Sequence, residues 1–78
     1  PGWTLSDDAL SVSATLEFAN FVAALGFMTE VAIAAETLDH HPEWSNVYKR
    51  VEVFLVTHEA GGITQRDFEL AAIMDSLA

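Results

Sequence analysis

One stretch decides the fold of this chain: Leu10-Ser11-Val12-Ser13-Ala14-Thr15-Leu16-Glu17-Phe18. Apolar and polar residues alternate along it, so one face would be apolar and the other polar. This period of two is typical of an antiparallel strand that covers a core on one side. The preceding Ser6-Asp7-Asp8 favours a turn, and Trp3–Leu5 before it would pair with this strand as a hairpin.

An apolar helix is expected next. Asn20 is a good N-cap residue, and from Phe21 to about Leu38 the composition is helical, with Glu30 as the one charge before Ala35. Such a helix would bury more than one side, one against a sheet and another against a partner subunit. Pro42 is expected to end it, because the residue before a proline disfavours helical geometry.

Two further strands and a second helix complete the pattern. Trp44–Tyr48 and Val51–Thr57 have strand character, and the capping box Thr64-x-x-Asp67 starts a helix that runs from about Gln65 to the end. The order β-β-α-β-β-α predicts a single α+β domain over residues 1–78. We expect a two-layer sandwich, with a four-stranded antiparallel sheet and helices packed on one face.

Composition limits the class of partner. The net charge is −9 with only three basic residues, so direct nucleic-acid binding and binding to an anionic membrane are disfavoured. The apolar run Phe21–Ala35 contains Glu30 and is expected to be too short to span a bilayer. We therefore expect a soluble, cytoplasmic protein.

Hydrophobic content is 51%, which is high for 78 residues without cysteine. A chain of this length has a core of marginal size, so part of its apolar surface would lie between subunits. The sequence therefore predicts an oligomer, and a monomer with an alanine-rich helix is the alternative.

Candidate chemistry gathers in Glu36-Thr37-Leu38-Asp39-His40-His41-Pro42-Glu43-Trp44. Histidine titrates closest to neutrality, and a third one, His58, follows a predicted strand. Glu36 and His40 are four residues apart and would share a helix face. If His58 meets the pair at a cleft, the imidazoles can supply an acid and a base together, as addition or elimination of water requires.

An apolar wall would complete such a site. Pro42, Trp44 and Phe54 would provide the flat surface that a heteroaromatic substrate needs.

Two other interpretations of the histidines stay open. Glu36, His40 and His58 are ligands of the kind that catalytic zinc uses, although their spacing matches no H-E-x-x-H pattern. The histidines would otherwise be structural, with the pair capping a helix and His58 finishing a strand. No serine or cysteine nucleophile and no phosphate-binding glycine loop is indicated.

The chain resembles the pterin-4a-carbinolamine dehydratases. The resemblance rests on E-x-x-x-H-H-P-E-W-x-N-V-Y from Glu36 to Tyr48, and on Gly26-Phe27-Met28-Thr29, Thr57-His58 and Gly62-Ile63-Thr64 to Asp67. It implies an α+β fold that assembles into a homodimer or homotetramer. It also implies dehydration of 4a-hydroxytetrahydrobiopterin to quinonoid dihydropterin without cofactor or metal, which recycles the pterin of aromatic amino acid hydroxylases.

The same resemblance implies roles for individual residues. His40 and His58 would be the acid/base pair, and His41 would position the substrate. Other residues would contact or support the pterin: Glu36, Asp39, Pro42, Trp44, Val56, Thr57, Glu59 and Asp67. Some vertebrate members also act as a dimerisation cofactor for a homeodomain transcription factor, so a partner-binding role is a second expectation.

Overall fold

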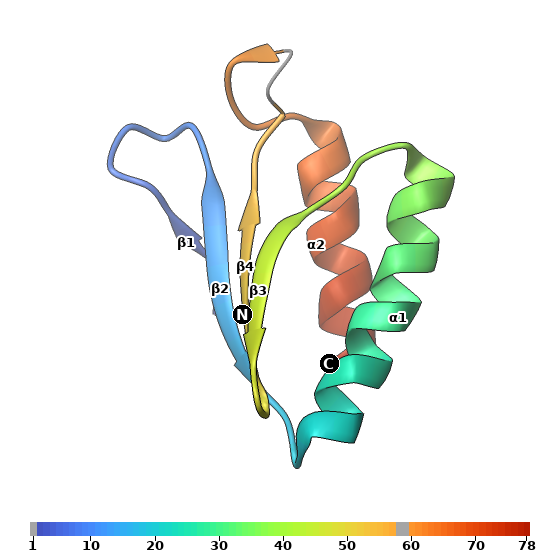
Figure 1. The fold of residues 1–78 in the computed structure, drawn as a ribbon. Coiled ribbons are helices and arrows are strands. Elements are labelled where there is room, and N and C mark those ends of the chain that lie inside the picture. The colour runs from blue at the N-terminus through green and yellow to red at the C-terminus, as the bar shows by residue number, and fades with distance from the viewer. Residues whose placement is uncertain (1, 58–59) are drawn as a thin grey trace.

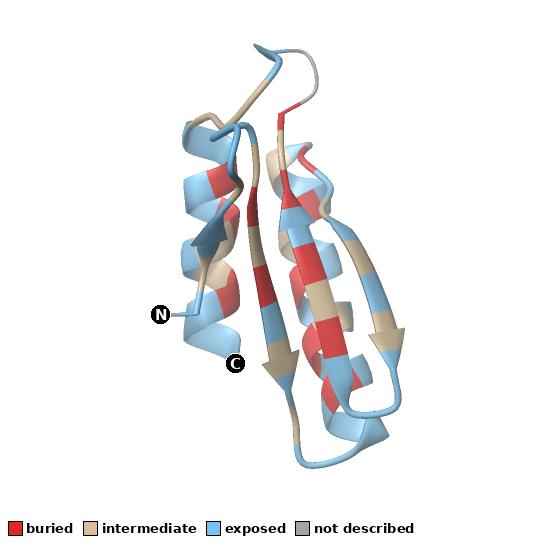
Figure 2. Cartoon of the chain, turned by 90° about the vertical axis from the view of Figure 1, so that its left-hand side faces the viewer, coloured by how far each residue is buried: buried red, intermediate tan, exposed pale blue. Residues whose placement is uncertain are grey.

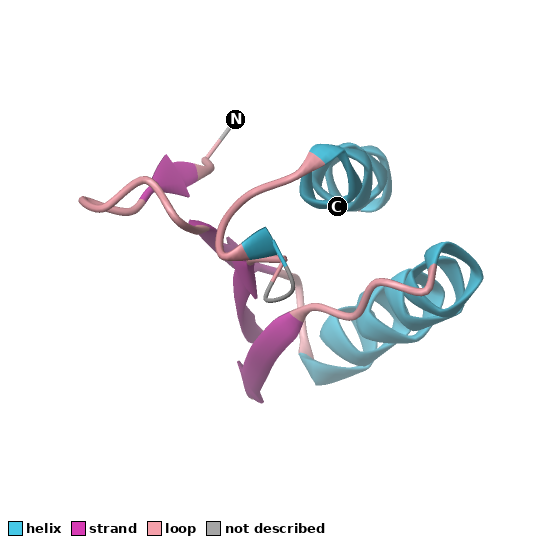
Figure 3. Ribbon diagram, turned by 90° about the horizontal axis from the view of Figure 1, so that it is seen from above, coloured by secondary structure: helices cyan, strands magenta, loops and turns pink. Residues whose placement is uncertain are grey.

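The structure, a computed structural model, describes residues 2–57 and 60–78. Its elements are β1 (Thr4–Leu5), β2 (Val12–Glu17), α1 (Phe21–Leu38), β3 (Glu43–Val47), β4 (Arg50–Leu55) and α2 (Gln65–Leu77). The strands form one four-stranded antiparallel sheet in the order β1-β2-β4-β3 (Figure 1). Seen from above, both helices lie on the same side of this sheet (Figure 3). The predicted α+β sandwich is confirmed.

The alternation along β2 and β4 determines which face of the sheet is covered. Ala14 lies opposite Val53, and Leu16 lies opposite Val51, so residues on the same face meet across the pair. Buried residues alternate with less buried ones along β2 and β4, and further buried residues lie on both helices (Figure 2). The core residues are Val12, Ala14, Val51, Val53 and Leu55 from the sheet, Ala24, Phe27, Val31 and Ala35 from α1, and Leu70 and Met74 from α2.

The ends of the first hairpin differ from the prediction. β2 begins at Val12 because Ser6 closes the preceding loop: its N–H donates to the Ser11 carbonyl (2.9 Å), and its Oγ accepts from the N–H of Ser11 (3.1 Å). Before β1, the indole N–H of Trp3 donates to Asp75 of α2 (3.0 Å). The first hairpin is thereby tied to the helix layer.

Helix α1 starts as predicted, since the Asn20 side chain accepts a hydrogen bond from the Ala23 N–H (2.9 Å). With 18 residues and a mean hydropathy of 1.6, it is long and apolar enough to cross a membrane by length and composition alone, contrary to expectation. Core helices meet the same criterion, and one side of α1 packs into the core. Its opposite side stays exposed, with 76% of Val22, 47% of Leu25 and 66% of Ile33 accessible.

A side chain holds the turn between β3 and β4. The Asn46 amide donates to the carbonyls of Tyr48 (3.0 Å) and Arg50 (2.9 Å), while Tyr48 adopts a left-handed conformation with φ of 53°. Left-handed geometry is unfavourable for a tyrosine, so the two hydrogen bonds stabilise a strained turn. The asparagine of the N-V-Y string therefore has a structural explanation.

Replacing Asn46 with alanine should destabilise the fold without changing any activity of the site. Loss of the two partly solvated hydrogen bonds is expected to lower the free energy of unfolding by about 1 kcal/mol. Urea denaturation measures it, and Ser45→Ala on the same strand is the matched control. An Asn46→Ala variant as stable as Ser45→Ala would show that the turn does not depend on this amide.

Candidate active site

Helix α1 ends in a left-handed residue. Asp39 has φ of 51° and ψ of 43°, its N–H bonds the Glu36 carbonyl (3.2 Å), and the His40 N–H bonds the Ala35 carbonyl (3.0 Å). These are the two hydrogen bonds of a Schellman motif, in which one left-handed residue turns the chain out of the helix. The prediction that Pro42 ends the helix was therefore wrong, because the helix has already ended at Leu38.

This reversal separates the two adjacent histidines. His40 is buried, with 7% of its surface exposed, whereas His41 remains exposed. The expected pairing of Glu36 with His40 was wrong, because the helical turn does not continue that far. Glu36 Oε1 instead lies 2.6 Å from Nε2 of His41, in a pair that faces solvent and contributes little to stability.

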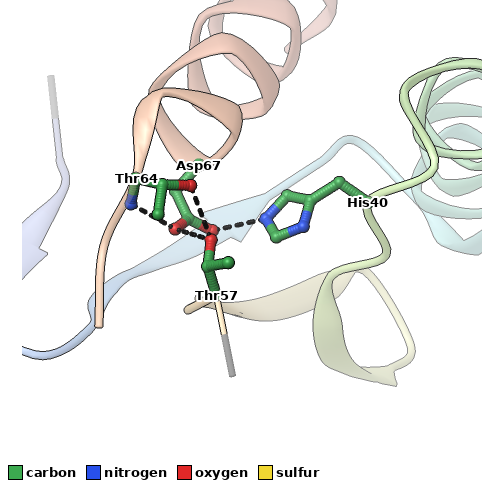
Figure 4. Close-up of polar contacts among 4 residues, drawn as sticks. All are labelled: His40, Thr57, Thr64 and Asp67. Carbon is green, nitrogen blue, oxygen red and sulfur yellow. Dashed lines mark hydrogen bonds and ion pairs between the residues drawn. The ribbon is translucent and has the colours of Figure 1, made fainter. Parts of the chain in front are cut away.

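The buried histidine meets a buried carboxylate. Nε2 of His40 lies 2.6 Å from Oδ1 of Asp67, which is fully buried in the first turn of α2 (Figure 4). The other carboxylate oxygen, Oδ2, accepts from the hydroxyl of Thr57 (2.7 Å) and from the N–H of Thr64 (3.0 Å). The ends of α1 and β4 and the start of α2 therefore meet at one carboxylate.

The surroundings of Asp67 keep it ionised. Burial acts to raise the pKa of this carboxyl, but hydrogen bonds from His40, from the Thr64 N–H and from Thr57, together with the charge of His40, hold the pKa below its ordinary value of 3.8. A carboxylate can only accept, so Nε2 of His40 donates the proton. In the neutral imidazole Nδ1 is then the basic nitrogen.

A cavity of about 420 Å³ adjoins this network. It is lined by Thr57, Ala60, Thr64, Gln65 and Arg66, from the end of the sheet and the start of α2. Its volume is within the range of small-molecule sites.

The predicted apolar wall does not form as one surface. Trp44 lies opposite Val53 and faces the helices, whereas Phe54 lies opposite Glu43 on the other face of the sheet. Phe54 is 49% exposed and lines a separate hollow of about 340 Å³ with Ser13, Thr15 and Glu52. The expectation that Trp44 and Phe54 flank one substrate was wrong, because side chains alternate along a strand.

The remaining predicted site residues lie around the end of α1 and the end of β4. Pro42 and Val56 are half-buried in connecting segments, and Asp39 forms the turn described above. His58 and Glu59 lie outside the described residues. Thr64 was missed as a site residue; its signal was the capping box, which was interpreted as a helix start only.

The described part of the chain does not support the zinc site considered from the sequence. Within residues 2–57 and 60–78, no three His, Cys, Asp or Glu side chains converge as a ligand set. Two of the three ligands considered, Glu36 and His40, bond to different residues.

The protein is therefore a small α+β sandwich with a buried imidazole–carboxylate pair beside a cavity. Both titratable groups lie at one end of its sheet. The family model described as pterin 4 alpha carbinolamine dehydratase matches residues 1–77. The chain belongs to this family.

Relatives agree over nearly the whole chain. A provisionally named pterin-4-alpha-carbinolamine dehydratase from Rhizobium leguminosarum is 62% identical over 99% of this chain and 76% of its own length. A protein with the same provisional name from Sinorhizobium fredii is 53% identical over 99% of this chain and 73% of its own length. The solved structure of a transcriptional coactivator/pterin dehydratase from Brucella melitensis superposes with a TM-score of 0.95 at 43% identity, covering 99% of this chain and 82% of that one.

The stability of the fold should depend on pH through Asp67. Its folded pKa lies below 3.8, so its contribution is fully present above the unfolded pKa and is lost as pH falls through the folded value. Denaturation of the wild type and of Asp67→Asn between pH 6 and about pH 3 measures this, since every other carboxyl is common to both. The difference in unfolding free energy should shrink as pH falls. A difference that stays constant would show that Asp67 is not held ionised by folding.

Proposed function

We propose that this chain dehydrates a 4a-hydroxytetrahydropterin, such as 4a-hydroxytetrahydrobiopterin, to the quinonoid dihydropterin and water. The observation that carries the proposal is the shared carboxylate of Asp67, which bonds His40 on one side and Thr57 on the other. Thr57 immediately precedes His58 in the chain. The network therefore supports a convergence of the helix end and the strand end on a single site.

Dehydration requires two proton transfers. The hydroxyl on the pterin leaves as water after it receives a proton, and the neighbouring ring nitrogen loses one. With Nε2 of His40 bonded to Asp67, its Nδ1 takes the proton from the substrate nitrogen, and the carboxylate stabilises the imidazolium that forms. His58 delivers the proton to the leaving hydroxyl, and His41, held by Glu36, positions the pterin.

The His40→Gln variant tests the central role in this mechanism. Glutamine can still donate to Asp67 but cannot act as a base, so the dehydration rate should fall about 10²- to 10⁴-fold with the fold intact. Stopped-flow dehydration of synthetic carbinolamine measures the rate, and circular dichroism monitors the fold. His41→Gln is the control, with a smaller loss expressed mainly in KM.

Wild-type activity in a folded His40→Gln variant would overturn this assignment. The same assay resolves the metal alternative, because proton transfer by histidines should be unaffected by exhaustive chelation. Activity that disappears on chelation and returns with zinc would favour the site of His40, His58 and Glu36 instead.

We further propose that the exposed side of α1 is buried between copies of this chain, as a homodimer or homotetramer. Val22, Leu25 and Ile33 form a charge-free stripe along this side. A side chain at Gly26 would meet no atom within 4 Å, so this position leaves room for the close approach of a second helix. Burial of this stripe would remove apolar surface from water, as a cytoplasmic protein requires. We also propose that the enzyme recycles a pterin cofactor.

A charge on this stripe should break the assembly. Val22→Glu and Ile33→Glu would each force a carboxylate into the contact between helices, so sedimentation should give a lower mass than for the wild type. The matched control is Ala72→Glu on the exposed side of α2, which should leave the mass unchanged. An unchanged mass in both α1 variants would show that α1 is not the contact.

A second candidate function is the binding of a transcription-factor partner through the same face of α1. The similar protein from Brucella melitensis is named a transcriptional coactivator as well as a pterin dehydratase. The two functions separate by mutation: His40→Gln should strongly slow dehydration and spare partner binding, whereas Ile33→Glu should weaken partner binding. Direct binding to nucleic acid is disfavoured by the net charge of −9.

A further inference from the structure

The hydroxyl of Thr57 cannot donate a hydrogen bond to a substrate, because its single proton is already donated within the protein. Thr57 is 5% exposed, and its Oγ donates its only proton to Oδ2 of Asp67 (2.7 Å). Its second contact, with Oγ of Thr64 at 2.7 Å, must then be one in which Thr64 donates. The result is a directed chain of protons from Thr64 to Thr57 to Asp67.

This chain of hydrogen bonds fixes the orientation of the carboxylate. Oδ2 accepts both the Thr57 hydroxyl and the Thr64 N–H (3.0 Å), so its lone pairs are taken. Oδ1 is left facing Nε2 of His40 at 2.6 Å (Figure 4). Two donors on one oxygen and one on the other define both the position and the plane of the carboxylate.

The backbone of Thr57 is also held in place. The Thr57 N–H donates to the Gly62 carbonyl (2.8 Å), and the Gly62 N–H donates back to the Thr57 carbonyl (3.2 Å). Thr57 therefore projects from a fixed point beyond β4, and Thr64 and Asp67 project from the start of α2.

We propose that Thr57 is a positioning residue, which acts through Asp67 on the tautomer and orientation of His40 and does not bind the pterin through its hydroxyl. This deepens the proposed dehydration and rests on it for its kinetic consequence. The Nε2–H tautomer of His40 is favoured only while Oδ1 faces the ring as an ionised acceptor. Loss of the Thr57 hydroxyl frees the carboxylate to rotate and weakens its hold on the proton of His40.

Thr57→Val and Thr57→Ser form a matched pair for the test. Valine keeps the shape and removes the hydroxyl, whereas serine keeps the hydroxyl and removes a methyl group. Thr57→Val should lose about 10- to 100-fold in kcat with KM little changed, and Thr57→Ser should stay within about threefold of the wild type. A hydroxyl that bound substrate in ground and transition state alike would instead raise KM in Thr57→Val and leave kcat unchanged, which would overturn the proposal.

The tautomer of His40 can be measured without any substrate. This measurement tests the positioning role of Thr57 separately from the proposed dehydration. The ¹⁵N shifts of labelled histidine report the tautomer of His40, assigned by comparison with His40→Gln. The Nε2–H form should dominate in the wild type and in Thr57→Ser and should decline in Thr57→Val, whether or not the pterin is the substrate. If Thr57→Val does not fold, Thr64→Val replaces it, with a smaller change in the same direction; no change in tautomer in either variant would overturn the proposal.

Discussion

A buried, ionised carboxylate imposes the main constraint on this structure. Removing a carboxylate from water costs several kcal/mol unless hydrogen bonds replace its hydration. Asp67 obtains these from an imidazole, a hydroxyl and a backbone N–H, supplied by the end of α1, the end of β4 and its own helix. One end of the sandwich is therefore closed around a charge, while the body of the core is apolar.

The contacts that hold this end of the fold together are also the ones that the proposed reaction would use. The bond between His40 and Asp67 joins the two helices at the end of the molecule where the cavity of about 420 Å³ lies. An imidazole anchored through one nitrogen keeps the other for proton transfer, and the anchoring carboxylate offsets the charge that this transfer creates. The proposed reaction thus uses a polar group that the fold must satisfy in any case.

The sequence predicted the layers of this fold more completely than the arrangement of its site. Alternation in β2 and the capping box of α2 are local signals, and the structure bears out both. Asp67 was accordingly predicted as a helix cap, but its contact with His40 spans 27 residues and depends on how the helices pack. The pairing of Glu36 was mispredicted because a left-handed aspartate looks like any other helix-end residue in the sequence. The faces of Trp44 and Phe54 required the strand register, which the sequence left open.

The left-handed turn at Asp39 has a consequence for engineering. A non-glycine residue in this conformation costs roughly 1–2 kcal/mol, which glycine would relieve. Glycine would also give the denatured chain more freedom, at a cost of about 0.4–1 kcal/mol, so much of the gain would cancel. Aspartate restricts the backbone between the helix and the buried imidazole more than glycine would. Attempts to make this scaffold more thermostable at that position would reduce the rigidity of the buried His40 ring for a small thermodynamic return.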